Sequence, residues 1–314
     1  MNSLISIFLL LLPTVVLGMV PRAAPIFAAA LGEDVDQSAG TLNLGVEGMM
    51  LLGTIIGFVI DFETGDFVLA FIVAGLASAL LALFHGIATI SFKADQVTSG
   101  TAIWFIGWGL SGFIYSSLFG KASSPPVVKT IPTLYIPHLT DIPYIGKFLF
   151  GQDPVVYALL ITFLVVQYFL FHTKAGLNLR TVGEDPLVAE IMGVNPDLYR
   201  YLALIFGGFM AGVGGAYITL SLVGSFYFDM TAGMGFIAVA LVYFGKWNPV
   251  RVLIGSLVFG AVYVLYLALE TYFPATPYQF FSMFPYIATM ILIILVGARS
   301  HAPAALALPY IKEG

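Results

Sequence analysis

The chain has 314 residues, of which 60% are hydrophobic and only 9% are charged, and its mean hydropathy is +0.99. A soluble domain carries about 25% charged residues, so this composition excludes an ordinary water-soluble fold with a large soluble domain. The net charge of −5 is too small and too dispersed for a nucleic-acid-binding protein. The lack of cysteine excludes disulfides, thiolate metal sites and cysteine nucleophiles.

Long uncharged runs indicate that the chain crosses a bilayer as helices. A hydrocarbon core of about 30 Å needs about 20 apolar residues per helix, and lipid admits only helices or closed barrels. The uncharged runs 154–171 and 201–228 are too long for barrel strands. We predict an all-α fold, a polytopic membrane helical bundle with nine or ten transmembrane helices, as one domain over residues 1–314. The predicted spans are 3–31, 45–60, 67–91, 96–117, 154–172, 200–222, 232–246, 250–269 and 280–298.

The first span permits two interpretations. It lacks a basic segment before its apolar stretch, so we interpret it as a retained span rather than a signal peptide. Pro13, Pro21, Arg22 and Pro25 interrupt it. This pattern fits either one broken helix or a full span followed by a short re-entrant piece. The number of membrane crossings is therefore nine or ten.

Two polar segments precede the second and the seventh span. Residues 38–48 and 224–235 both combine glycines, a carboxylate and hydrogen-bonding side chains. Glycine-interrupted segments at corresponding places predict broken helices around a central path, and their free N-termini offer N–H groups to a polar solute. The candidate translocation-pathway residues are Asn43, Glu47, Asp229 and Thr231.

Glu47 has two possible roles. Carboxylates inside membranes are costly and usually face a cavity or a partner, so Glu47 either lines the solute path or braces the broken helix through backbone N–H groups. Its position about one turn inside the membrane edge slightly favours bracing.

The distribution of basic residues predicts the orientation. The residues that share one side under the nine-span count are Lys93, Lys174, Arg180, Arg200, Lys246, Arg251, Arg299 and Lys312. That side is expected to be cytoplasmic. The external loop, residues 118–153, carries Lys121, Lys129 and Lys147, but long loops translocate largely regardless of charge. Its proline and tyrosine content predicts an ordered external cap.

Small residues recur at four-residue spacing in several spans. The pairs are Gly53 and Gly57, Gly208 and Gly212, Ala211 and Gly215, and Ser256 and Gly260. Such pairs let helix backbones approach closely, and we expect them to pack within the chain, with a dimer face as the minority alternative.

The sequence contains no signature of an enzyme. No G-x-x-x-x-G-K-[ST], G-x-S-x-G or H-E-x-x-H motif occurs, and the four histidines are scattered. We therefore expect no catalytic residue, no cofactor site and no metal site. Energy for transport must come from another subunit or from an ion gradient.

The most charged stretch is the predicted cytoplasmic loop 172–200. Within it, residues 183–193 (GEDPLVAEIMG) are typical of a short helix, with Asp185 as N-cap, Pro186 at the first position and Gly193 at the end. Leu187, Ile191 and Met192 form an apolar ridge. A capped helix between two spans is suited to docking, while an amphipathic helix on the lipid surface is disfavoured by its acidic residues.

Three sequence blocks carry a family resemblance over nearly the whole chain. GEDPLVAEIMGV followed by GGFMAGVGGAY resembles the coupling-helix region of type II ABC importer permeases. TLNLGVEGMMLLG and FDMTAGMGFIAVALVYFGKWNP resemble the signatures of the nucleoside and simple-sugar branch, relatives of the ribose permeases. Agreement is poorer in residues 32–37 and in the external loop.

The resemblance implies the type II ABC importer permease fold with broken helices, in the cytoplasmic (inner) membrane of a prokaryote. It implies cytoplasmic ABC ATPase subunits that bind the ATP, a second and paralogous permease subunit, and an extracellular solute-binding lipoprotein. The residues it assigns to ATPase coupling are Glu184, Asp185, Pro186, Ala189, Glu190 and Gly193.

The expected function is nucleoside import, because a path rich in aromatics with few charges suits a neutral ribosyl base. A simple-sugar permease of the ribose or galactose type is the nearest alternative. A stand-alone ion-coupled carrier using Glu47 or Asp229 is less favoured. A membrane enzyme is the most distant alternative.

Overall fold

The structure is a computed structural model that describes residues 2–120, 124–142, 145–296 and 301–311. Lys121, Arg299 and Lys312 lie outside these ranges. Within them the regular structure is helical and contains no strand. The helices are α1 (Asn2–Ser38), α2 (Val46–Thr64), α3 (Phe67–Gly86), α4 (Gln96–Phe119), α5 (Ile145–Phe150), α6 (Pro154–His172), α7 (Lys174–Glu184), α8 (Pro186–Ile191), α9 (Pro196–Tyr217), α10 (Met234–Gly245), α11 (Pro249–Tyr272), α12 (Tyr278–Ser282) and α13 (Phe284–Val296). Short π-helical segments, η1 (Ile87–Ser91) and η2 (Ile218–Val223), extend α3 and α9.

Among the described helices, six are long and apolar enough to cross a membrane. They are α1, α3 with η1, α4, α6, α9 with η2, and α11. This confirms an all-helical, multi-pass membrane protein. The remaining predicted spans correspond to α2, which carries three acidic residues, and to the shorter α10 and α13. The total of nine or ten crossings therefore stays a prediction.

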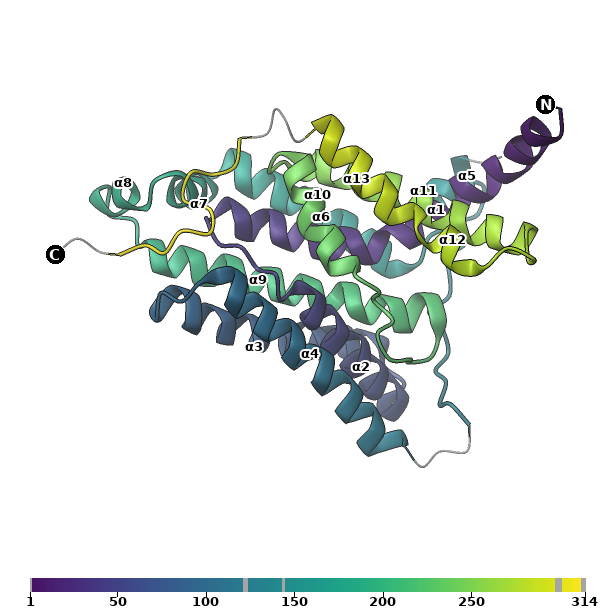
Figure 1. The fold of residues 1–314 in the computed structure, drawn as a ribbon, viewed down its shortest axis with the longest axis horizontal. Coiled ribbons are helices and arrows are strands. Elements are labelled where there is room, and N and C mark those ends of the chain that lie inside the picture. Colours follow the sequence, from purple (N-terminus) through teal and green to yellow (C-terminus); the bar gives the residue numbers. More distant parts are fainter. Residues whose placement is uncertain (1, 121–123, 143–144, 297–300, 312–314) are drawn as a thin grey trace.

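Helix α1 runs through the middle of the bundle (Figure 1). It packs along α9 and α11, while α2, α3 and α4 lie on the other side of α9. Although it contains Pro13, Pro21 and Pro25, α1 is one helix that continues to Ser38, seven residues beyond the predicted end at 31. The last turns of α1 are buried against other helices rather than exposed in a loop, and their apolar residues Leu31 and Val35 belong to the core.

The small-residue pairs pack within the chain, as predicted. A Cβ atom on Gly53 of α2 would lie 2.3 Å from the carbonyl oxygen of Gly212 on α9, and one on Gly215 would lie 2.0 Å from that of Met50. On α11, a Cβ on Gly260 would lie 2.2 Å from the Met19 carbonyl oxygen of α1. These glycines allow backbone contact between the central helices.

We expect Gly215→Ala to destabilise the bundle, because the added methyl group overlaps the Met50 carbonyl and forces α2 and α9 apart. The expected loss is about 1–3 kcal/mol, the usual cost of overpacking. The matched control is Gly109→Ala in α4, where a Cβ meets nothing within 4 Å. Thermal unfolding in detergent should show a lower midpoint for Gly215→Ala only. Equal midpoints for the two variants would contradict this packing.

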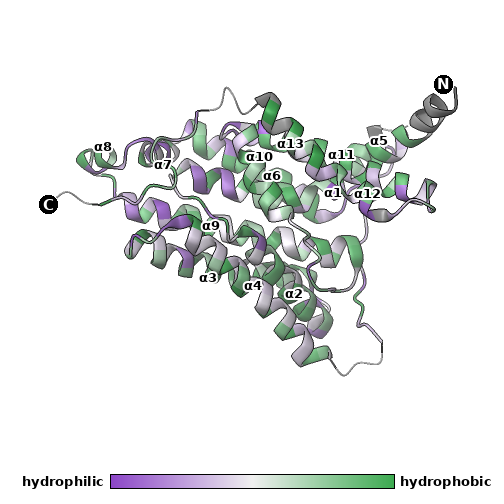
Figure 2. Cartoon of the chain, in the orientation of Figure 1, coloured by the Kyte–Doolittle hydropathy of each residue, from purple (hydrophilic) through white to green (hydrophobic). Residues whose placement is uncertain are grey.

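Three of the basic residues predicted to share one side lie around helices α7 and α8, and the assignment of this side to the cytoplasm stays a prediction. Lys93, after η1, pairs with Asp197 at the start of α9, with Nζ 3.5 Å from Oδ1. Arg180 of α7 and Lys246 after α10 line one shared surface depression. Helices α7 and α8 lie at this end, beside the polar last turns of α1 (Figure 2).

The described parts of the external loop form an ordered cap. The N–H of Val128 donates to the Gly224 carbonyl at 2.8 Å, and that of Ile131 donates to Leu220 at 3.0 Å. The N–H of Leu134 donates to the Gln152 carbonyl at 2.9 Å. The loop is therefore fastened over η2 and the start of α6, as its composition predicted.

Candidate functional site

Glu47 joins the two polar segments that interrupt the bundle. Its Oε1 accepts hydrogen bonds from Thr231 Oγ1 at 2.5 Å and from the Gly233 N–H at 2.8 Å, and Oε2 accepts from the Gly235 N–H at 2.6 Å. The side chain is buried, at 2% exposure. Helix α10 has Gly233 at its N-cap and no side-chain cap of its own. A carboxylate from α2 therefore caps α10, where it also meets the positive end of the helix dipole.

This geometry agrees with the bracing interpretation of Glu47, since both oxygens are engaged by protein donors. The approach is possible because residue 235 is glycine, whose Cβ would lie 2.6 Å from the Glu47 backbone nitrogen. We call Glu47, Thr231, Gly233 and Gly235 the Glu47 clasp. A hydrogen bond to a charged group contributes about 1.5–3 kcal/mol. The clasp is therefore a strong link between α2 and α10.

The other two candidate pathway residues differ in exposure. Asn43 is fully buried, and its Oδ1 accepts from the Gly45 N–H at 2.9 Å, which shapes the turn before α2. Asp229 is exposed and has a positive φ of 62°. Thus Asn43, Glu47 and Thr231 form internal contacts, while Asp229 faces outward.

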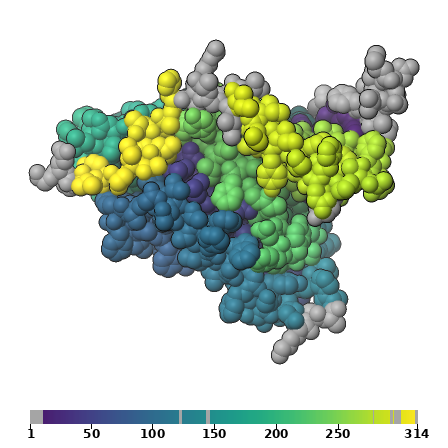
Figure 3. All heavy atoms as spheres, in the orientation of Figure 1, coloured from purple at the N-terminus to yellow at the C-terminus, as the bar shows by residue number. Residues whose placement is uncertain are grey.

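Aromatic side chains surround the segment that carries Asp229. Phe228 lies against Trp108 of α4 with ring centroids 4.7 Å apart, and Phe236 lies 5.3 Å from Trp104. On the other side, Tyr286 of α13 donates a hydrogen bond to the Ala232 carbonyl at 2.7 Å. In Figure 3 the green α10 region lies between blue α4 and yellow α13, so these groups share one face.

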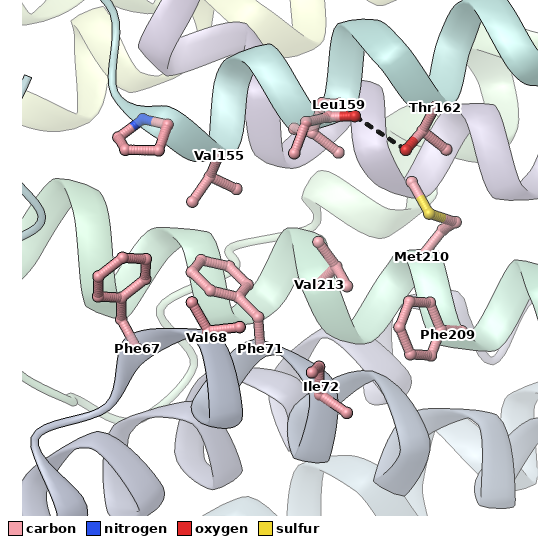
Figure 4. Close-up of a pocket in the computed structure, with 12 residues that line it drawn as sticks. Phe67, Val68, Phe71, Ile72, Val155, Leu159, Thr162, Phe209, Met210 and Val213 are labelled. Carbon is pink, nitrogen blue, oxygen red and sulfur yellow. Dashed lines mark hydrogen bonds between the residues drawn. The ribbon is translucent and has the colours of Figure 1, made fainter. Parts of the chain in front are cut away.

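A groove elsewhere in the bundle is almost entirely apolar. A groove of about 310 Å³ lies between α3, α6 and α9 (Figure 4). Its one hydroxyl-bearing side chain is Thr162, whose Oγ1 donates to the Ala158 carbonyl at 2.9 Å. Such a groove suits lipid chains and offers nothing to a polar solute.

Helix α8 has the caps that the sequence predicts. Asp185 Oδ1 accepts from the N–H groups of Leu187 and Val188, both at 3.0 Å, with Pro186 at the first position. Gly193 follows the helix with φ 82°. Ala189 is fully buried. The exposed fractions of the outward residues are 41% for Leu187, 46% for Val188, 75% for Ile191 and 76% for Met192. We call these four residues the α8 ridge.

The segment 301–311 lies across α7 and α8, a feature that sequence reasoning missed. The N–H of Ala305 donates to the Gly183 carbonyl at 2.9 Å, and the N–H of Ala307 donates to Gly40 at 3.2 Å. The Tyr310 hydroxyl donates to Glu190 Oε2, and Arg200 Nη1 donates to the Leu308 carbonyl at 3.2 Å. Figure 3 shows this segment in yellow over the teal helices. We call it the C-terminal strap, and it ties α8 to the turn after α1.

A buried polar cluster at the end of α1 was also missed. Glu33, Asp34 and Asp36 are fully buried within the described residues. Gln37 donates from Nε2 to Glu33 at 3.2 Å and accepts from Trp247 Nε1 at 3.2 Å. These residues fall where the family resemblance is weak, so no motif marked them. Their acidic character predicted a loop, and only the packing of α1 shows that they are enclosed.

The comparisons with known proteins agree with this architecture. Residues 15–296 match the family model described as "Branched-chain amino acid transport system / permease component". The chain is 34% identical to the guanosine ABC transporter permease protein NupQ of Bacillus subtilis, over 92% of this chain and 94% of that protein.

Two further relatives differ in the solute that their names give. The putative glucose ABC transporter permease protein TsgC13 of Haloferax volcanii is 36% identical, over 94% of this chain and 96% of that protein. The nucleoside ABC transporter permease protein NupC of Lactococcus lactis is 30% identical, over 96% of this chain and 98% of that protein.

Proposed function

Because this chain belongs to the family of branched-chain amino acid transport system permease components, we propose that it carries nucleosides across the prokaryotic cytoplasmic membrane. The chain is a permease subunit of an ABC importer and is not itself an enzyme. Members of this family work with ATPase and solute-binding partners. We propose one permease domain over residues 1–314 with nine or ten crossings, and ATP bound by the partner subunits.

Helix α8 is the proposed docking element for the ATPase. The observation that carries this proposal is a doubly capped helix whose α8 ridge is apolar and exposed at the basic end of the bundle. Buried Ala189 and the Glu190–Tyr310 contact seat the helix on the permease. Glu184, Asp185, Pro186 and Gly193 set its two ends. A seated helix transmits a push from the ATPase to the spans as a rigid body.

The proposed translocation path runs along the face that bears Asp229. Its aromatic rings suit stacking with a base, and the exposed carboxylate suits the hydroxyls of a ribose. Asn43, Glu47 and Thr231 support this face from behind through internal hydrogen bonds. A second permease, which we propose to be a paralogue, would complete the path. An extracellular lipoprotein would deliver the solute from the outside.

The nearest alternative is a simple sugar, because a putative glucose permease is 36% identical to this chain. A sugar also stacks on aromatic rings and bonds to a carboxylate. Ion coupling through Glu47 is disfavoured, because both oxygens of Glu47 already accept hydrogen bonds and a coupling carboxylate must exchange its partners.

The function is tested with the complete importer in liposomes, containing both permeases, the ATPases and the binding protein. We expect labelled guanosine or uridine to accumulate only when ATP is supplied to the ATPase side. The same liposomes are tested for uptake of labelled glucose, and for nucleoside uptake driven by a proton or sodium gradient in the absence of ATP. Accumulation of glucose alone would identify a sugar importer, and gradient-driven uptake without ATP would contradict the coupling.

A further inference from the structure

A cavity with several polar groups in its wall lies at the outer end of the bundle, apart from the Glu47 clasp and from Asp229. It has a volume of about 590 Å³ and is bounded by α1, η2, α11 and the external cap. Its polar groups come from Arg22, Gln152, Asp153, Tyr217, Ser221 and Thr271, among others. Sites for small molecules usually enclose about 300–1,000 Å³. The cavity is therefore large enough for a solute of nucleoside size.

Arg22 is the most unusual residue of this cavity. It lies inside the apolar stretch Leu11–Ser38 of α1, which is long enough to cross a membrane. Its guanidinium carbon is 5.7 Å from the centre of the Tyr263 ring. It forms no hydrogen bond or ion pair with any residue that the structure describes. An arginine within a span is costly and usually marks a solute or ion path.

The nearby acid does not neutralise Arg22 directly. Asp153 uses Oδ1 to cap α6 through the N–H groups of Val155 and Val156, at 2.9 and 3.1 Å. Its Oδ2 accepts from the Tyr217 hydroxyl at 2.5 Å. The hydroxyl oxygen of Ser221 lies behind the cavity wall, covered by its neighbours and without a partner among the described residues. The cavity thus presents a guanidinium that no described acid pairs and whose one contact is the face of the Tyr263 ring.

These groups define the chemistry of a ligand. Arg22 and Asp153 are the charged residues among those that line the cavity, and their formal charges cancel, so a neutral molecule is favoured over an anion. The guanidinium offers donors in a plane and requires acceptors placed side by side. A 6-oxopurine provides such a pair in O6 and N7, which arginine binds with two parallel hydrogen bonds. An adenine presents an amino donor at that position.

We propose that this cavity is an outer binding site for a 6-oxopurine nucleoside, with the O6/N7 edge on Arg22 and the ribose toward Thr271. The proposal rests on the nucleoside import proposed above and adds a site and a preference to it. Solute released outside the membrane would bind here before it reaches the face that bears Asp229.

The chain lacks cysteine, so single cysteines can report on this cavity without background. Thr133→Cys and Thr271→Cys, at two exposed residues that line the cavity, are made separately in the complete importer and treated with a charged thiol reagent from outside. The control is Thr64→Cys, an exposed residue at the end of α2. We expect guanosine to slow labelling in the cavity about 10-fold and adenosine to have much less effect, in line with the discrimination of a bidentate arginine. Thr64→Cys should label equally fast in all conditions.

The decisive variant is Arg22→Gln combined with each cavity cysteine. We expect it to abolish the protection by guanosine and to remove the preference over adenosine. Three results would overturn the proposal: guanosine still protects the cysteines in the Arg22→Gln variant, or no compound protects them, or glycerol 3-phosphate alone protects them. The last result would indicate a site for a lipid headgroup. ATP-driven guanosine uptake is measured on the same liposomes. If the importer without substitutions shows no ATP-driven guanosine uptake, the proposed function has failed. If it takes up guanosine but guanosine does not slow cysteine labelling, only the proposed cavity site is overturned.

Discussion

Replacing Ile191 with glutamate will stop ATP-driven transport while leaving the permease folded. Ile191 is 75% exposed on the α8 ridge, so its side chain does little for the stability of the isolated chain. In the proposed complex it enters an apolar pocket of the ATPase, where an unpaired carboxylate is strongly unfavourable. Loss of a central apolar anchor costs about 2 kcal/mol or more, which lowers affinity for the ATPase about 30-fold.

The control for this prediction is Leu198→Glu in the first turn of α9. Leu198 is also an exposed apolar residue at the same end of the bundle, at 52%, but it lies outside the α8 ridge. Co-purification of the ATPase and nucleoside uptake are measured for both variants, with thermal unfolding as the test of folding. Normal ATPase binding by Ile191→Glu, or an equal loss for Leu198→Glu, would show that α8 is not the docking helix.

Local patterns in the sequence predicted the elements that depend on neighbouring residues. Asp185, Pro186 and Gly193 are enough to define α8, because caps act within a few residues. Likewise, the glycine-rich segments predicted where helices stop, and the structure has non-helical chain between α1 and α2 and between η2 and α10. Helix α7 was not predicted, since its charged residues resemble a loop until its buried face is known.

Local sequence patterns could not predict contacts between residues that lie far apart in the chain. The sequence suggested that Glu47 braces a helix, but not that its partners are residues 231, 233 and 235, which follow 184, 186 and 188 positions later in the chain. The C-terminal strap is held by backbone pairs and by side chains of Glu184, Glu190 and Arg200, and these residues lie more than 100 positions from the strap in the sequence. The cavity around Arg22 combines α1, η2, α11 and the external cap, which no spacing rule brings together. Arg22 itself was visible, but it was noted only as an interruption of a span.

The Glu47 clasp gives the second prediction with a large effect. In Glu47→Ala three donors lose their acceptor, including two N–H groups at the start of α10. We expect a loss of about 3 kcal/mol or more in stability, since buried donors without partners are costly, together with loss of most uptake. In Glu47→Gln the amide oxygen still accepts from Thr231 and Gly233. Its NH₂ group, however, meets the Gly235 N–H, so an attraction becomes a repulsion between donors.

Glu47→Gln should therefore assemble with the partner subunits but transport several-fold more slowly, with a thermal midpoint between wild type and Glu47→Ala. Thr231→Val, which has nearly the same shape and lacks the hydroxyl, should be milder than either. Since Glu47 and Thr231 are in direct contact, the double variant should lose less than the sum of the two single losses. Additive losses, or wild-type uptake and stability in Glu47→Gln, would mean that the carboxylate does not hold α10 in place during transport.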